Sequence, residues 1–289
     1  MTPGEQGFLL LTQQLGDPNR KPLTLAQFRE LTLRARKMEQ PSEEDRALEL
    51  RDLVGLGCDF LTGEHILSLL SQESLLQSYL DRGRSASCIP ISRISPSYPE
   101  PLRKKLDTDA PGCLWAKGDL SLLSTPMLGL VGSRDLYPEN FRFAQEAGRQ
   151  AALQGYTLVS GNARGADTEA QKSCLAQGGK VISVVADRLD AHPLEKNILY
   201  LSENGFDLPF SAARALSRNR IIHCLPQAVL VAQVTHGKGG TWGGALRNLK
   251  QHWTPLFCFP DGRQGTKALL EFGAGSVTLP DLKALDFFL

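Results

Sequence analysis

Short apolar runs separated by helical patterns dominate the chain from residue 127 onward. Continuous rather than alternating hydrophobicity is typical of strands covered on both faces, and helical crossovers between such strands imply a parallel sheet. The segment PENFRFAQEAGRQAALQ is predicted to be one such helix, with Phe141, Ala144, Ala147 and Ala151 on one face. The pattern predicts an α/β fold over residues 127–289, a Rossmann-like, doubly wound and mostly parallel sheet. The runs read as strands are LGLVGS, YTLVSG, KVISVVAD, AVLVAQV and PLFCFPD.

The first 80 residues instead carry apolar positions at three- and four-residue spacing, which predicts a small helical domain over residues 1–80. Thr24 and Ser42 are expected N-caps. The stretch LVGLG followed by HILSLL is similar to a helix-hairpin-helix, whose glycine turn can offer N–H groups to a phosphate. Because the surrounding charge is negative, a purely structural turn is favoured.

Residues 81–126 are dense in proline and serine but include apolar side chains that need burial, among them Ile89, Ile91, Leu102, Leu114 and Trp115. We therefore expect a connecting segment that packs on the domain at 127–289 rather than a free linker.

Composition and charge exclude some classes of protein. With 289 residues, 42% hydrophobic and 22% charged, the chain is typical of a globular protein, and no apolar run approaches the roughly 20 residues of a membrane span. With no basic region before the first apolar stretch, we expect no signal peptide and place the protein in the cytoplasm. The net charge is +1 overall but −4 over residues 1–80, so an anion-binding surface is expected downstream. The cysteines lack the spacing of a zinc site and are read as free thiols: Cys58, Cys88, Cys113, Cys174, Cys224 and Cys258.

Glycine and a cation follow three of the predicted strands. Glycine lets the backbone approach a ligand, N–H groups at helix starts favour anions, and Lys or Arg adds positive charge. Because carboxyl ends of parallel strands meet at one edge, we expect one phosphate-binding edge there. Its expected residues are Gly132, Ser133, Arg134, Ser160, Gly161, Arg164, Gly165, Lys238, Gly239, Gly240 and Thr241. Asp167 is expected to fix the second turn or to pair with Arg164.

The stretch SAARALSRNRIIHCLP adds Arg214, Arg218 and Arg220 ahead of a strand. Arg214 and Arg218 are four residues apart and share a helix face, so at least two guanidinium groups can point the same way. A solvated basic helix face is the alternative.

GSR after the first strand, SGNARGAD after the second, RNRII, and FPDGRQGTKALLEFGA near the end stand in an order that resembles the DprA/Smf family of DNA-processing proteins. The resemblance covers about residues 88–279, and the N-terminal helices are vaguely similar to that family's sterile-alpha-motif-like domain. It implies a cytoplasmic dimer, without a cofactor, that protects single-stranded DNA and helps load a RecA-type recombinase in DNA uptake or recombination. It also implies that the glycine turns hold phosphate and that Arg218, Asn219 and Arg220 form another wall of the pocket.

The loop GKGGTWGG leaves a second class of function open, because it is similar to the loop of the lonely-guy phosphoribohydrolases. Gly244 stands where those enzymes carry a carboxylate, so we expect no catalytic activity, and a nucleotide-binding sensor is the main alternative. Trp242 could stack on a base, although burial in the core is favoured. The sequence therefore predicts a single-stranded DNA-binding protein that tolerates any base sequence.

Overall fold

The computed structural model describes residues 1–36 and 48–287, and the N-cap expected at Ser42 lies outside these residues. A nine-stranded sheet runs through the described part of the chain in the order β1-β2-β6-β5-β4-β3-β7-β8-β9. The strands β6, β5, β4, β3, β7, β8 and β9 run parallel to one another, whereas β2 pairs antiparallel with β6 and β1 pairs antiparallel with β2 at one edge. The strands are β1 (Ile89–Ser92), β2 (Cys113–Gly118), β3 (Met127–Val131), β4 (Thr157–Ser160), β5 (Lys180–Val185), β6 (Ile198–Glu203), β7 (Ala228–Val231), β8 (Leu256–Cys258) and β9 (Gly275–Ser276).

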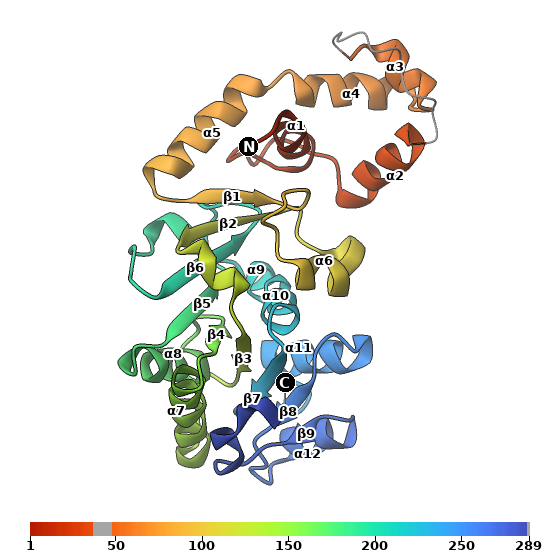
Figure 1. Ribbon diagram of the computed structural model, residues 1–289. Coiled ribbons are helices and arrows are strands. Elements are labelled where there is room, and N and C mark those ends of the chain that lie inside the picture. Colours follow the sequence, from red (N-terminus) through yellow and green to blue (C-terminus); the bar gives the residue numbers. More distant parts are fainter. Residues whose placement is uncertain (37–47, 288–289) are drawn as a thin grey trace.

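Helices cover both faces of the parallel part of the sheet, with α7 and α8 on one side and α10 and α11 on the other (Figure 1). The α/β, doubly wound fold predicted from the sequence is confirmed. The helices of the described residues are α1 (Pro3–Thr12), α2 (Leu25–Ala35), α3 (Leu50–Gly55), α4 (Phe60–Leu70), α5 (Glu73–Ser85), α6 (Glu100–Leu106), α7 (Pro138–Leu153), α8 (Ala166–Ala176), α9 (Ala212–Ser217), α10 (Asn219–Cys224), α11 (Gly239–Gln251) and α12 (Gln264–Glu271).

Alternate side chains of each central strand enter two separate cores. Leu128 and Leu130 of β3 pack in the cluster that includes α7 and α8, whereas Met127 and Val131 pack in the cluster that includes α10. The strands are therefore apolar at nearly every position because both faces are buried. In α7, Phe141 was expected on the core face but is 37% exposed. Phe143 is buried instead, because the apolar stripe of the helix is centred on Phe143, Ala147 and Ala151.

Helices α1 to α5 form a separate layer above the sheet, coloured red to orange in Figure 1. Thr24 caps α2 in a capping box with Gln27, as expected. The layer meets the sheet through an aromatic cluster of Tyr79 from α5, Trp115 from β2 and Phe206, with ring centroids 4.8 to 5.2 Å apart. Residues 81–126 supply β1 and β2 to the sheet in addition to α6, so this segment is part of the sheet's edge. The domain boundaries at 80 and 126 stay a prediction.

No helix in the residues described here is both long enough and apolar enough to cross a membrane.

Candidate anion-binding site

A cavity of about 400 Å³ opens beyond the carboxyl ends of β3, β4 and β5. This volume is in the range of small-molecule sites. The lining from the turns after β3 and β4 and from the end of α9 is cationic, and the lining from β5 and the segment after β6 is mainly apolar, with the carboxylate of Asp187 as the exception. We call this cavity the arginine pocket; its lining residues are Arg134, Gly161, Asn162, Ala163, Arg164, Val185, Ala186, Asp187, Phe210, Ala215 and Arg218.

Arg218 is the most unusual of these residues because it is only 7% exposed and two of its donors, Nε and Nη1, have no hydrogen-bond partner among the described residues. Burial lowers the pKa of its guanidinium, and the nearby carboxylate of Asp167 acts against that shift. An arginine side chain keeps its proton in folded proteins, so the group is a cation. Because Asp167 offsets only part of this buried charge, an anion in the pocket would be attracted to the guanidinium.

Gly161 is what allows Arg218 to sit there. A Cβ atom added at position 161 would lie 1.4 Å from Nη1 of Arg218, so the guanidinium packs directly on the glycine backbone. No other residue type leaves this space.

Asp167 builds the turn that carries Gly161. Its Oδ2 accepts hydrogen bonds from the backbone N–H groups of Gly161 at 3.0 Å and Ala163 at 3.3 Å, which confirms the expected turn-fixing role. Burial raises the pKa of Asp167, and Arg218 and the two backbone donors oppose that shift. Gly165 follows with a φ of +93°, a conformation that favours glycine.

Arg134 and Arg164 complete the cationic wall. Arg134 is exposed and makes no side-chain hydrogen bond or ion pair with any residue that the structure describes. Arg164 pairs with Asp135 at 2.8 Å rather than with Asp167, and both partners are largely exposed. Exposed pairs of this kind contribute about 0–1 kcal/mol, so Arg164 can exchange Asp135 for a ligand at little cost.

Four of the other predicted residues have structural contacts instead. Ser133 donates its N–H to Gln233 O, and Ser160 is fully buried, where its Oγ accepts from Gln171. Asn219 donates to Gly240 O and ties α10 to the start of α11. Arg220 is held by Glu203 and by the carbonyl of Asp109, away from the pocket lining. Arg214 also has a structural role and does not line the pocket, because its guanidinium donates to backbone carbonyls.

The third glycine turn lies outside the arginine pocket. Lys238 and Gly239 are exposed at the start of α11, and Thr241 Oγ1 donates to Gly132 O at 2.9 Å. The sheet order explains this, because β7 lies on the opposite side of β3 from β4 and β5. Gly132 is required by close packing, since a Cβ atom there would lie 2.4 Å from Ala166 Cβ. Trp242 is partly buried against a core cluster, in agreement with its interpretation as a core residue.

Sequence reasoning missed the facing wall of the pocket. Phe210, 59% exposed, and Ala215 come from the segment after β6, and Ala186 and Asp187 follow β5. The signal for Phe210 was weak: an aromatic residue after Leu-Pro that belongs to no periodic apolar pattern.

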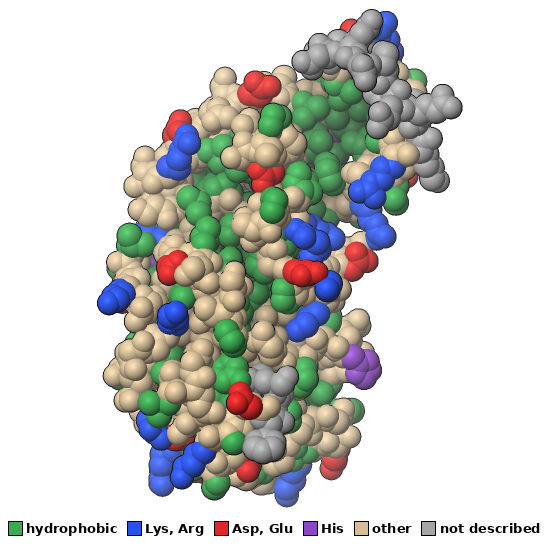
Figure 2. Space-filling view, viewed as in Figure 1, with side chains coloured by type: hydrophobic (Ala, Val, Ile, Leu, Met, Phe, Trp, Pro, Cys, Tyr) green, Lys and Arg blue, Asp and Glu red, His purple; other side chains and the backbone are tan. Residues whose placement is uncertain are grey.

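Charge is otherwise dispersed on the face of the molecule in Figure 2, where Lys and Arg are interspersed with Asp and Glu and form no continuous patch. In the described residues, no cluster of three or more His, Cys, Asp or Glu side chains could hold a metal ion.

Gly161→Ala tests this geometry. The new methyl group must displace Arg218, so affinity for an oligothymidine, the ligand class implied by the resemblance, should fall by about one to two decades. Gly243→Ala in α11 is the matched control, because a Cβ atom there meets nothing within 4 Å. It should keep full affinity and gain up to about 1 kcal/mol of stability. Equal affinities of the two variants, measured by fluorescence anisotropy, would contradict the geometry.

Comparisons with known proteins agree with the resemblance. The family model of DNA recombination-mediator protein A matches residues 90–284. Protein Smf of Escherichia coli (strain K12) is 32% identical over 190 residues, which are 60% of this chain and 50% of Smf, so this chain matches about half the length of that relative.

Solved structures give the same assignment. The X-ray structure of DNA processing protein A (DprA) from Streptococcus pneumoniae matches with a TM-score of 0.76 and 25% identity, over 100% of this chain and 99% of that one. DprA from Helicobacter pylori, described with its single-stranded DNA binding mode, matches with a TM-score of 0.59 and 27% identity, over 70% and 97% of the two chains. Since the family model matches well over half of its residues, this chain belongs to the DprA/Smf family of DNA recombination-mediator proteins.

Proposed function

We propose that this protein binds single-stranded DNA and that the arginine pocket holds one nucleotide of the strand. The buried, unpaired guanidinium of Arg218 carries the proposal, because a phosphodiester is the anion that DNA brings to every nucleotide. The H. pylori relative, for which a single-stranded DNA binding mode is described, supports the choice of DNA as the ligand.

The two walls of the pocket suit the two halves of a nucleotide. The phosphate would contact Arg134, Arg164 and Arg218, and the base would lie against Phe210. Base–aromatic stacking contributes about 1–3 kcal/mol per base and is available to all four bases. Phosphate contacts carry no sequence information either, so binding through these walls tolerates any base sequence.

The proposed role is binding without catalysis. Gly244, in the loop similar to that of the phosphoribohydrolases, faces His223, and a Cβ atom added there would lie 2.9 Å from His223 Nε2. A glutamate at position 244 would therefore collide with the buried side chain of His223. In the phosphoribohydrolases a carboxylate at this position assists departure of the base, and this chain has no carboxylate there.

The family resemblance extends the proposal to a homodimer in the cytoplasm that helps load a RecA-type recombinase. A dimer face at α12 and β9 is supported by the position of β9 at the end of the sheet and by Phe272, 58% exposed directly after α12. Recombinase loading is measured as faster filament assembly on DNA that carries this protein, and no acceleration would exclude it.

Sedimentation equilibrium at micromolar concentration tests the dimer. We expect a dimer for the wild-type chain and a shift toward monomer for Phe272→Asp, because a charge on an apolar interface is costly to bury. A wild-type monomer would remove this part of the proposal.

Arg134→Ala tests the binding role of the pocket. The loss of one charge-assisted contact should lower oligothymidine affinity by about one to two decades. The melting temperature should barely change, since Arg134 has no partner in the described structure. Lys238→Ala, outside the pocket, should lower affinity less, and Arg142→Ala, an exposed arginine on α7, is the matched control.

Titration with a panel of nucleotides runs in parallel with the DNA titrations. The proposal predicts weak binding of single nucleotides and tight binding of oligothymidine, because a longer strand adds contacts along the sheet edge. Tight nucleotide binding without DNA binding would instead assign the pocket to a nucleotide sensor, and unchanged DNA affinity in Arg134→Ala would remove the pocket from the DNA site.

A further inference from the structure

Phe210 is placed by its backbone rather than by packing. It stands in residues 204–211, which connect β6 to α9, and the residue is 59% exposed although it lines the arginine pocket. An exposed ring keeps a fixed position only if the segment that carries it is held. We call residues 204–211 the Phe210 segment.

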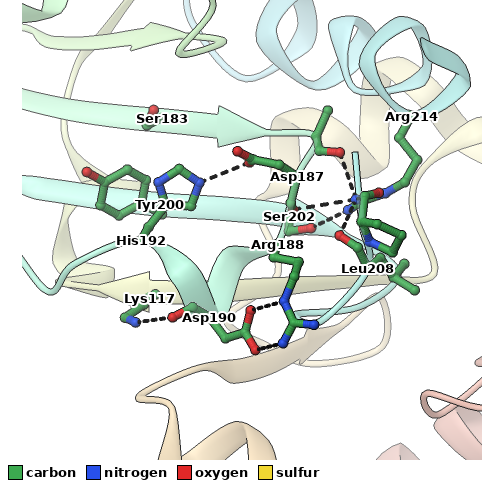
Figure 3. Close-up of polar contacts among 12 residues, drawn as sticks. Lys117, Ser183, Asp187, Arg188, Asp190, His192, Tyr200, Ser202, Leu208 and Arg214 are labelled. Atoms are coloured by element: carbon green, nitrogen blue, oxygen red, sulfur yellow. Dashed lines mark hydrogen bonds and ion pairs between the residues drawn. The ribbon is translucent and has the colours of Figure 1, made fainter. Parts of the chain in front are cut away.

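Arg214 of α9 holds one end of the Phe210 segment (Figure 3). Its Nη1 donates to the carbonyl oxygens of Leu208 at 2.8 Å and Pro209 at 2.9 Å, and also to that of Ala186 at 2.7 Å. The first two oxygens belong to the Phe210 segment, and the third belongs to the residue directly after β5. One guanidinium therefore joins the two stretches of chain that form the apolar wall of the pocket.

Ser202 at the end of β6 completes this contact. Its Oγ accepts a hydrogen bond from Arg214 Nη2 at 2.8 Å and donates to the carbonyl of Gly205 at 2.9 Å. Ser202 is fully buried, so water does not compete for either bond. The same guanidinium is thereby also fixed to the rigid sheet.

Tyr79 of α5 holds the middle of the Phe210 segment from the N-terminal layer. Its hydroxyl donates to Asp207 Oδ1 at 2.8 Å, and Arg82 lies 3.5 Å from Asp207 Oδ2. Burial and the hydrogen bond to Asp207 raise the pKa of Tyr79, so the phenol remains a donor at neutral pH. A helix more than a hundred residues away in sequence thus reaches the wall of the pocket.

Resting on the proposed function, we propose that Arg214 and Tyr79 are positioning residues that hold Phe210 against the base of a bound nucleotide. Neither residue lines the pocket, so neither contacts the ligand. Both act through the Phe210 segment, and the N-terminal helical layer contributes to DNA binding by this route.

Arginine is needed at position 214 because its planar fork presents five donors in fixed directions. A lysine keeps the charge but has one ammonium group, which cannot reach Ser202 on the sheet and three carbonyls on two loops at once. Arg214→Lys should therefore loosen the Phe210 segment without leaving an apolar hole. Tyr79→Phe removes only the hydroxyl that reaches Asp207.

The test is a double-mutant cycle on the full chain with an oligothymidine that carries one 2-aminopurine, whose fluorescence is quenched when the base stacks. Arg214→Lys, Tyr79→Phe and Phe210→Ala should each lower affinity, by about tenfold for Phe210→Ala, and reduce the quench. In the Phe210→Ala background, Arg214→Lys and Tyr79→Phe should have no further effect. The control is Arg20→Lys, a buried arginine that donates to main-chain carbonyls in the helical layer and should leave the quench unchanged.

Additive losses in the double variants would overturn the proposal, because Arg214 and Tyr79 would then affect binding by a route that does not involve Phe210. An unchanged quench in Arg214→Lys and in Tyr79→Phe would overturn it as well. If Arg214→Lys unfolds at the assay temperature, the Tyr79→Phe cycle alone decides. A wild-type chain that does not bind the oligothymidine is a different result, since it contradicts the proposed function rather than the positioning role of Arg214 and Tyr79.

Discussion

A buried positive charge without hydrogen-bond partners on two of its donors governs the arrangement of this site. Arg218 can occupy its place only because position 161 has no side chain and because Asp167, with its carboxylate fixed by two backbone N–H groups, offsets part of the charge. A side chain at position 161 would displace the guanidinium, and loss of the Asp167 carboxylate would leave a buried cation with less compensation, which is among the costlier defects of a folded protein. The second glycine turn, the start of α8 and the end of α9 therefore depend on each other.

The sheet order brings the walls of the pocket together from distant parts of the chain. The turns after β3 and β4 supply Arg134, Gly161 and Arg164, and the connection from β6 to α9 supplies Phe210 from the far side of β5. Cationic and aromatic side chains then face one space, which matches the charged and the apolar half of a nucleotide. The N-terminal layer belongs to the same system, because Tyr79 reaches Asp207 in the segment that carries Phe210.

The sequence was sufficient for the parallel core of the fold and for the cationic residues that line the arginine pocket, whose role in binding stays a prediction. Uninterrupted apolar runs identified β3, β4, β5, β7 and β8, because those strands are buried on both faces. Two strands were not recognised by this test: β1 at the edge of the sheet, which contains a proline, and β6 inside the sheet, whose short apolar run stands between polar loops. Arg134, Gly161, Arg164 and Arg218 were found from their motifs and line one pocket. The sequence could not show that Arg220 and Lys238 lie outside the pocket. Arg220 is held by Glu203, which is distant in sequence, and the position of Lys238 depends on the strand order.

The salt dependence of oligothymidine binding by the wild-type chain and by Arg218→Met tests the central claim most directly. Each phosphate neutralised on a single strand contributes about 0.7 to the slope of log affinity against log salt. If Arg218 receives a phosphate, the slope of the variant should be shallower by about that amount, and folding should be retained because Asp167 keeps its two backbone hydrogen bonds. An identical slope in the two proteins, together with equal affinity, would show that no phosphate enters the arginine pocket.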